Sequence, residues 1–283
     1  SIMNEDLDQQ DGNKLYINLG GGVFEETALD AGVDDGGWGW GVSMGDLDHD
    51  GDVDIVETNG WSAGTWTDEQ SYLFLNDGDG TRFTQSAAEV GIDNSGMGRG
   101  TILFDHDNDG DLDIAFISSD IKFELYRNDA SASNTNHWVQ IRLDTSSSVS
   151  IAPDGVGAHV VITAGGVTQH RWMQANSGYL SQGPIVIHAG LGDATAIDRV
   201  EIYWSNGSVR VIEDLAIDTL HVLTPCDGDM NSDRRVTMED FDLFLKAFMA
   251  GDRSTDLDAN ARHNLQDIFA FIYSFNRGCP EDR

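Results

Sequence analysis

Apolar residues in the first part of the chain fall in short runs that Gly- and Asp-rich turns separate. Such runs occur at Leu15–Ile17, Val53–Val56, Thr101–Leu103 and Ile114–Phe116, and short apolar runs bounded by turn residues are typical of β-strands. The three-to-four-residue spacing of an amphipathic helix does not occur in this region of the sequence. The pattern therefore predicts β-structure throughout residues 1–130.

An internal repeat organises these strands. The segment Gly37–Ile55 recurs as Gly96–Ile114, a matching lead-in precedes each copy from Leu15 and Leu73, and another lead-in opens at Leu125. Two full units of about four strands each, without helices, predict blades of a β-propeller. Because closed propellers use about four to eight blades, we expect an open arc whose apolar faces are covered by another domain or by neighbouring copies of the chain.

The hydrophobic pattern changes at His137, where the Asp-rich loops stop. Longer alternating or continuous apolar runs follow, separated by turn clusters such as Gly165-Gly166 and Asn206-Gly207. This pattern predicts an antiparallel β-sandwich over residues 136–224. The expected strands are 137–143, 159–163, 168–172, 185–188, 198–204 and 208–212.

Helical periodicity appears only after Pro225. Apolar residues recur at i, i+3, i+4 and i+7, which predicts helices over 238–250 and 265–275. The two cysteines of the chain, Cys226 and Cys279, lie at the two ends of this segment. We interpret them as one disulfide that closes a small domain over residues 226–280, which requires an oxidising compartment. The overall expectation is a mainly β chain with a small α-helical C-terminal domain.

The charge of the chain excludes several classes of partner. There are 49 acidic and 16 basic residues, which gives a formal net charge of −33. Nucleic acids and anionic membranes both require a basic surface, so neither is expected as a partner. With 40% hydrophobic residues the chain is not a disordered acidic tail. The acidic residues must therefore have a structural use.

The sequence also bears on localisation. No apolar run reaches the roughly 18 residues of a membrane span, so membrane insertion is not expected. Ser1–Glu5 lack the basic and apolar regions of a signal peptide, which was either removed already or never present. Together with the expected disulfide, these features favour a secreted or cell-surface protein.

The repeated loop Asp-x-Asp-x-Asp-Gly-x-x-Asp has the chemistry of a calcium site. Carboxylates at positions 1, 3, 5 and 9 and a carbonyl at position 7 converge when the Gly at position 6 bends the backbone, and such oxygen ligands suit Ca²⁺ better than Mg²⁺. A solvated acidic turn is the alternative, but clustered acids repel one another strongly without a cation. The expected ligands are Asp46, Asp48, Asp50, Asp54 and the Asp52 carbonyl in the first loop, and Asp105, Asp107, Asp109, Asp113 and the Asp111 carbonyl in the second.

A second kind of loop precedes each C-terminal helix, with oxygen side chains at positions 1, 3, 5, 9 and 12 as in an EF-hand. Position 6 holds Arg234 and Ala261 in place of Gly, which strains the bend and predicts weaker binding than in the first pair of loops. Ordinary acidic helix caps are the alternative. With the four loops together we expect about four Ca²⁺ ions. The expected ligands here are Asp229, Asn231, Asp233, Thr237, Asp240 and the Arg235 carbonyl, then Asp256, Asp258, Asn260, Asn264, Asp267 and the Arg262 carbonyl.

These motifs resemble three known families. The Asp-loop repeats resemble the FG-GAP/VCBS blades of integrin-type propellers, in which the ion is structural. The segments Gly155–Val160, Ser177–Gln182 and Val200–Gly207 are similar to the ASPIC/UnbV domain, a resemblance that implies no established catalytic activity. The C-terminal pair of loops and helices resembles a type I dockerin, which implies a cohesin-like protein partner.

Catalytic motifs do not fit their structural context. Gly60–Gly64 matches the G-x-S-x-G string of serine hydrolases, but no helix pattern follows, so we expect an ordinary loop. His49 and His106 are expected to be exposed loop residues. Three further histidines are expected to be half-buried side chains of sandwich strands, and no zinc-binding string occurs. These three are His159, His170 and His188.

The sequence favours a non-enzymatic protein of adhesion or assembly, with copies of itself as partners in head-to-tail contacts that need not close. A cluster of Trp38, Trp40, Trp61 and Trp66 could stack on sugar rings, although core packing or a subunit interface is favoured. A carbohydrate-binding or cohesin-docked accessory module is therefore the alternative. A hydrolase with an acidic site is a weaker one.

Overall fold

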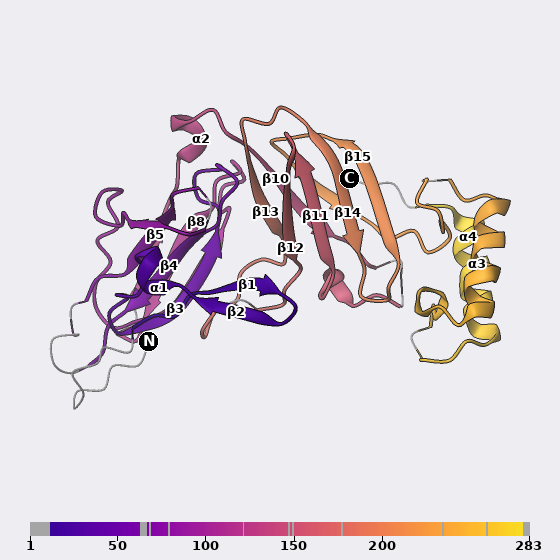
Figure 1. Ribbon diagram of the computed structural model, residues 1–283, viewed down its shortest axis with the longest axis horizontal. Helices are drawn as coiled ribbons and strands as arrows, with labels where there is room; N and C mark the ends of the chain where they lie inside the picture. Colours follow the sequence, from indigo (N-terminus) through magenta and orange to yellow (C-terminus); the bar gives the residue numbers. More distant parts are fainter. Residues whose placement is uncertain are drawn as a thin grey trace. The chain divides into compact units, whose positions relative to one another are not determined.

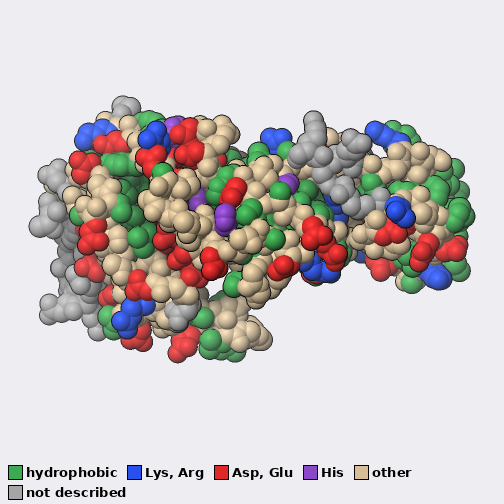
Figure 2. All heavy atoms as spheres, turned by 90° about the horizontal axis from the view of Figure 1, so that it is seen from above, with side chains coloured by type: hydrophobic (Ala, Val, Ile, Leu, Met, Phe, Trp, Pro, Cys, Tyr) green, Lys and Arg blue, Asp and Glu red, His purple; other side chains and the backbone are tan. Residues whose placement is uncertain are grey.

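The structure is a computed structural model that describes residues 12–62, 67, 69–78, 80–120, 122–146, 148, 150–176, 178–233, 235–258 and 260–279. The chain is mainly β (Figure 1). It divides into two compact units, one of residues 1–136 with 176–184 and one of residues 137–175 with 185–283. None of the described helices is long and apolar enough to cross a membrane. Figure 2 shows Asp and Glu side chains spread along the visible face, as expected from the formal charge of −33.

The first unit contains the two repeats as antiparallel sheets. Strands β3 and β4 of the first copy form a four-stranded sheet with β5 and β6 of the second lead-in, in the order β3-β4-β5-β6. Among the described residues, β7 and β8 of the second copy form a three-stranded sheet with β9 of the third lead-in, while β1 and β2 of the first lead-in pair as a hairpin. The propeller-like arrangement predicted from the repeats is confirmed in kind, without a closed barrel. The elements are β1 (Tyr16–Gly20), β2 (Val23–Glu26), α1 (Ala28–Ala31), β3 (Gly39–Gly45), β4 (Asp54–Asn59), β5 (Tyr72–Asn76), β6 (Phe83–Gln85), β7 (Gly98–Phe104), β8 (Asp113–Ser118), β9 (Phe123–Tyr126) and α2 (Ala130–Ser133).

The glycines of the repeat allow the first strands of the two blades to approach closely. A Cβ atom at Gly41 would lie 2.3 Å from the carbonyl oxygen of Arg99, so only glycine fits at this position. Nearby, the Ser43 hydroxyl donates to the Thr101 carbonyl at 2.9 Å. The last glycine of the Gly-x-Gly-x-Gly pattern in the first repeat is thus explained by the packing of β3 beside β7.

Two apolar clusters fill the first unit. One joins the blades through the faces of β4, β5 and β8, and the other packs α1 and Leu15 against the opposite face of the first blade. The first cluster includes Leu47, Val56, Leu73, Ala87, Ile92, Leu112, Ile114 and Phe116, and the second includes Ala28, Ala31, Val33, Phe74 and Phe83.

The second unit contains the predicted sandwich. Its sheets have the orders β13-β10-β16 and β12-β11-β14-β15, and their inner faces form one continuous apolar core. The sequence did not predict β16, which pairs parallel to β10 while the other pairs of the sandwich are antiparallel. The strands are β10 (His137–Leu143), β11 (His159–Ala164), β12 (Val167–Trp172), β13 (Ile187–Gly192), β14 (Ile197–Tyr203), β15 (Val209–Leu215) and β16 (Leu220–Leu223), with a 3₁₀ turn at Pro153–Gly155.

The predicted C-terminal helices are α3 (Met238–Ala250) and α4 (Leu265–Arg277), with a 3₁₀ turn at Arg253–Thr255 between them. Both begin with a capping box, at Thr237 and Asn264, which satisfies the first backbone N–H groups. The two helices pack through Phe244 and Phe271, whose rings stack with centroids 4.0 Å apart. A disulfide joins Cys226 to Cys279 across the segment.

One segment of the sandwich sequence packs elsewhere. Residues 176–184 connect β12 to β13 in the chain, yet they belong to the first compact unit. There the Ser181 hydroxyl donates to the Thr101 carbonyl at 2.9 Å, and the Tyr179 ring lies 5.5 Å from that of Trp40. The expectation that residues 136–224 form one continuous domain did not anticipate this excursion.

Candidate calcium-binding loops

The first Asp-rich loop connects β3 to β4 and gathers three carboxylates. Oxygen atoms of Asp46, Asp48 and Asp50 all lie within 4.8 Å of one another. The backbone wraps around them because His49 and Gly51 adopt positive φ angles of 63° and 101°. The donor set consists of oxygen atoms alone, and such a set fits a hard cation such as Ca²⁺.

Burial makes this cluster costly unless a cation neutralises it. Asp46 is only 1% exposed. Desolvation, followed by the charges of Asp50 and Asp54, raises the pKa of Asp46 to about 7, although an N–H donated by Gly51 opposes the shift. Asp46 is thus a buried carboxyl whose charged form needs positive charge nearby.

The last Asp of each loop joins the loop to the next lead-in. Asp54 accepts N–H bonds from Leu47 at 2.8 Å and from Asn76 at 2.9 Å. Its pKa is raised to about 7, mainly by burial. In the second repeat Asp113 occupies the same place and accepts from the N–H of Asn128 at 2.8 Å.

The side-chain amides of these residues also bind the loops, because Asn76 donates to the Val53 carbonyl and Asn128 to the Leu112 carbonyl, each at 3.3 Å. These bonds explain why the lead-ins from Leu73 and Leu125 both have Asn at their fourth position, a connection that was not predicted from the sequence. The signal was the recurring Asn itself, at Asn76 and Asn128, at the same place in each lead-in. Asp54 and Asp113 lie outside the three-carboxylate clusters of their loops. They stay predicted ligands.

The second loop connects β7 to β8 and repeats the same cluster. Oxygen atoms of Asp105, Asp107 and Asp109 lie within 4.8 Å of one another, but here all three residues are at least partly exposed. His106, at position 2, places Nδ1 2.7 Å from Oδ2 of Asp113. This hydrogen bond raises the pKa of His106 above its usual value.

The position-7 residues, Asp52 and Asp111, make the same backbone hydrogen bond, but the Asp111 side chain has a further role. The N–H of Asp52 donates to Asp50 at 2.9 Å, and that of Asp111 donates to Asp109 at 3.0 Å. The side chain of Asp111, however, is completely buried. Only its carbonyl was a predicted ligand, so the buried carboxylate is an additional feature.

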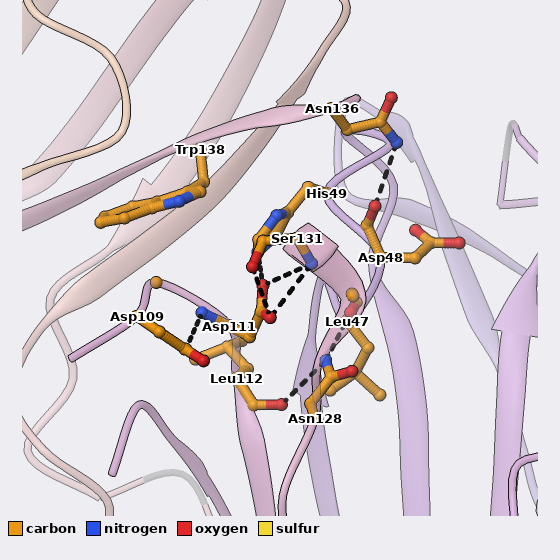
Figure 3. A network of polar contacts seen from close by, with 12 residues as sticks. Leu47, Asp48, His49, Asp109, Asp111, Leu112, Asn128, Ser131, Asn136 and Trp138 are labelled. Carbon is orange, nitrogen blue, oxygen red and sulfur yellow. Dashed lines mark hydrogen bonds and ion pairs between the residues drawn. The ribbon is translucent and has the colours of Figure 1, made fainter. Parts of the chain in front are cut away.

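That carboxylate contacts the first loop (Figure 3). His49 Nε2 lies 3.4 Å from Asp111 Oδ1, and neither side chain is exposed. Ser131 donates to Asp111 through its N–H at 3.0 Å and its hydroxyl at 2.9 Å. The expectation that His49 is exposed was wrong, because the second blade covers position 4 of the first loop. His106 is exposed as expected.

Side-chain amides complete the junction between the loops. Asn128 donates to the Leu47 carbonyl at 2.7 Å. Asn134 and Asn136 both donate to the carbonyl of Asp48, at 2.8 and 3.0 Å. The first loop is therefore held by the segment that follows the second blade, and its geometry depends on the packing of both blades.

The C-terminal loops gather their acids around the helix caps. In the second loop, oxygen atoms of Asp256, Asp258 and Asp267 lie within 4.8 Å of one another. Asp267 is fully buried and accepts from the N–H of Asn264 at 2.8 Å. Ala261, at position 6, adopts a φ of 60°. This is the left-handed conformation that glycine ordinarily supplies at this position, so the predicted strain at the bend is present.

The other predicted ligands of this second C-terminal loop are linked through the backbone. Asn260 accepts from the N–H of Arg262 at 2.9 Å, and its own N–H donates to Asp256 at 3.1 Å. Asn264 is the N-cap of α4 and accepts from the N–H of Gln266. The loop therefore closes on itself before the helix begins.

The first C-terminal loop has similar backbone hydrogen bonds, but its acids are not among the carboxylate clusters found in the described residues. Asp240 is fully buried and accepts from the N–H groups of Met230 at 2.9 Å and Thr237 at 2.8 Å. The N–H of Asp233 donates to Asp229 at 3.2 Å and to Asn231 at 3.0 Å, and that of Arg235 donates to Asp233 at 2.8 Å. Arg234 lies outside the described residues.

The tryptophan cluster is a stack of rings that contacts the second blade. Trp61 stacks between Trp38 and Trp40, with ring centroids 5.5 Å apart in each pair. The Arg99 guanidinium lies 4.2 Å from the Trp40 ring, on the side of the second blade. The faces of these rings are thus largely used within the unit, while Trp66 lies outside the described residues.

The remaining catalytic candidates gain no support from their surroundings. Ser62 lies in the connection between β4 and β5, in which the described residues form no helix, and Ala63 and Gly64 lie outside them. The ring of His188 stacks on that of Trp138, with the two centroids 6.4 Å apart.

Comparisons with known proteins agree with the two larger resemblances. The FG-GAP-like repeat family matches residues 5–57, and the family described as ASPIC and UnbV matches residues 149–229. The chain contains an FG-GAP-like repeat and an ASPIC/UnbV domain. Together these domains are consistent with an extracellular protein of the adhesion type.

The chain is also similar to Cartilage acidic protein 1 of Mus musculus. The two are 37% identical over 105 residues, which cover 37% of this chain and 15% of that protein. The chain therefore spans a small part of the length of this relative.

Proposed function

We propose that this chain is part of a secreted, non-enzymatic protein in which Ca²⁺ rigidifies the FG-GAP blades for contact with other copies of the chain. The observation that carries the proposal is the junction between the two Asp-rich loops. The first loop packs against the second blade through the buried contact of His49 with Asp111. Asp46 of its acidic cluster is buried, while Asp48 is partly exposed and Asp50 is exposed. A cation in that loop would therefore stabilise the blade packing as well as the loop.

The packing between the two blades is a template for self-association. The first blade turns Ser43 and Val56 toward β7 and β8, whereas Val42 and Met44 on the opposite face are 40% and 58% exposed. Beside them lies a cavity of about 660 Å³. Leu15 and α1 cover part of this face, and the uncovered part around Val42 and Met44 is apolar, as the face of a propeller blade is when no further blade packs on it.

The second blade has a matching open face. Its Phe116 and Tyr126 pack toward the first blade, while Ile117, Phe123 and Leu125 on the other side are 46%, 65% and 40% exposed. One copy could therefore place its second blade against the first blade of the next copy. Such head-to-tail contacts need not close and can produce polymers.

Light scattering of the full chain in millimolar calcium and in EGTA tests this proposal. We expect large assemblies in calcium that dissociate in EGTA. Phe123→Asp and Met44→Asp should each prevent assembly, whereas Val167→Asp, at a residue 61% exposed in the sandwich, should not. A monodisperse monomer in calcium would contradict the proposal.

A second candidate function is docking through the C-terminal helices. On α4, Leu265, Phe269 and Tyr273 are 67%, 65% and 63% exposed and recur at every fourth residue, so they form one apolar stripe. A dockerin-like unit would present such a stripe to a cohesin-like partner. Calcium-dependent binding to immobilised cohesin domains, lost in Phe269→Asp, would support this candidate, and failure to bind a broad panel would remove it.

A further inference from the structure

A row of aromatic rings lies on the outer face of the sandwich, outside the blades and the calcium loops. His159 on β11 pairs with Trp172 on β12 and with Tyr203 on β14 in the sheet register. His170, two residues before Trp172, points to the same face. Trp172 is 57% and Tyr203 is 40% exposed. The prediction that both histidines are half-buried is confirmed for His159 and was wrong for His170, which is exposed.

The rings form an ordered stack. The His159 ring lies 4.6 Å from Trp172, 5.1 Å from His170 and 5.6 Å from Tyr203, with interplanar angles of 12°, 17° and 23°. His159 Nε2 is 3.0 Å from His170 Nδ1, a hydrogen-bond distance that fixes one imidazole against the other. The stack is therefore arranged before any ligand binds, which lowers the entropy cost of binding.

Polar groups flank the rings. The Tyr203 hydroxyl donates to Glu201 at 2.5 Å, and Arg199 Nε donates to the other carboxylate oxygen of Glu201 at 2.6 Å. This face thus offers apolar ring surface beside oriented donors and acceptors. Amphipathic aromatic residues with such polar neighbours are typical of recognition surfaces.

The charge of this region differs from that of the rest of the chain. Residues 155–192, which include β11, β12 and β13, contain neither Asp nor Glu, although the whole chain has 49 acidic residues. The strand β12 contributes Arg171 and His170. The net charge of −33 repels polyanions from the molecule as a whole, whereas it does not repel a neutral ligand. The combination favours an uncharged ligand.

We propose that the row Trp172–His159–Tyr203, with His170, Glu201 and Arg199 beside it, binds a neutral polysaccharide. The inner faces of the stacked rings contact one another, so a sugar would use the face of Trp172 that is turned away from His159, on the edge strand β12. A pyranose ring has an apolar face that can stack there, and its hydroxyls can pair with the flanking carboxylate, guanidinium and imidazole groups. The outer face of a sheet suits an extended chain better than a small molecule, which requires a concave pocket.

Affinity electrophoresis of the full chain through gels that contain soluble neutral polysaccharides, such as xylan or hydroxyethyl cellulose, tests the site. Retardation by at least one of them is expected in wild type. Trp172→Ala should weaken the interaction about tenfold, because a stacked aromatic partner is lost. Trp172→Phe should retain most of the binding, which shows that the ring and not the fold is responsible.

Tyr16→Ala is the matched control, since Tyr16 is an exposed aromatic residue on β1, 59% accessible, and its loss should leave the retardation unchanged. Circular dichroism confirms that each variant is folded. The inference is overturned if no neutral polysaccharide retards the wild type, if Trp172→Ala binds as well as wild type, or if only anionic polysaccharides are bound. It is also overturned if Trp172→Ala changes only the oligomeric state, because the face would then be a protein interface.

Discussion

The two Asp-rich loops share one nine-residue pattern but differ in their surroundings. Asp46, at position 1 of the first loop, is 1% exposed, whereas its counterpart Asp105 in the second loop is partly exposed. The first loop is covered by Asp111, Ser131 and the side-chain amides that follow the second blade. A local motif therefore places the predicted ligands, while the next blade sets their burial and so the expected effect of a cation on stability.

Removing the position-1 carboxylate from each loop should give the largest contrast. In millimolar calcium, Asp46→Ala is expected to lower the free energy of unfolding by about 3 kcal/mol, because the linked binding energy of a well-saturated site is lost. Asp105→Ala, in the exposed loop, is expected to cost about 1 kcal/mol. Calorimetry of both variants in calcium provides the measurement.

In EGTA the order of these variants should change. Asp46→Ala removes a buried carboxyl whose pKa is raised to about 7, so the variant should be at least as stable as wild type at pH 7.5. Equal losses for the two variants in calcium, or the same loss for Asp46→Ala in both media, would show that burial does not distinguish the loops.

The second prediction concerns the contact that buries the first loop. His49→Ala should lower the free energy of unfolding by about 2 kcal/mol, because it opens a cavity and removes a partner of the buried Asp111 carboxylate. His106→Ala is the control in the second loop, where the side chain is exposed, and should cost less than about 0.5 kcal/mol. Chemical denaturation of both variants is sufficient, and a smaller loss for His49→Ala than for His106→Ala would refute the assignment.

Much of this organisation follows from the sequence, because it depends on local patterns. The predicted helix 238–250 has the observed bounds, and the predicted strand 137–143 is β10. The Asp-x-Asp-x-Asp spacing brings the first three carboxylates of each blade loop together. Strand β16, the excursion of residues 176–184 and the burial of His49 were missed. Each of these depends on a partner distant in the chain, which hydrophobic periodicity does not report.

Glu57 is a buried carboxyl outside the predicted calcium loops. The pH dependence of its contribution to stability therefore tests the effect of burial alone. This residue of β4 is 2% exposed, accepts from Asn13 at 2.6 Å, and lies outside the carboxylate clusters found among the described residues. Burial raises its pKa from 4.5 to about 7. The folded state therefore holds a proton that the unfolded state releases, and stability falls as pH rises from 4.5 through 7.

Glu57→Gln should remove this loss. We expect the variant to be about 2 kcal/mol more stable than wild type at pH 8 and nearly equal to it at pH 4. Unlike the effect of Asp46, this difference should be the same in calcium and in EGTA. Thermal melting across this pH range tests both statements, and a gain that disappears in calcium would place Glu57 within reach of the cation.

The smallest effect extends the comparison to the C-terminal loops, where position 6 is not glycine. Ala261 adopts a φ of 60° and Gly51, at position 6 of the first blade loop, a φ of 101°. Ala261→Gly relieves a left-handed conformation and should stabilise the folded loop by up to about 1 kcal/mol, whereas Gly51→Ala should destabilise by at least that amount. Isothermal titration should show a correspondingly tighter calcium site in Ala261→Gly. An unchanged affinity would mean that the buried cap residue Asp267, rather than the bend at position 6, limits binding in this loop.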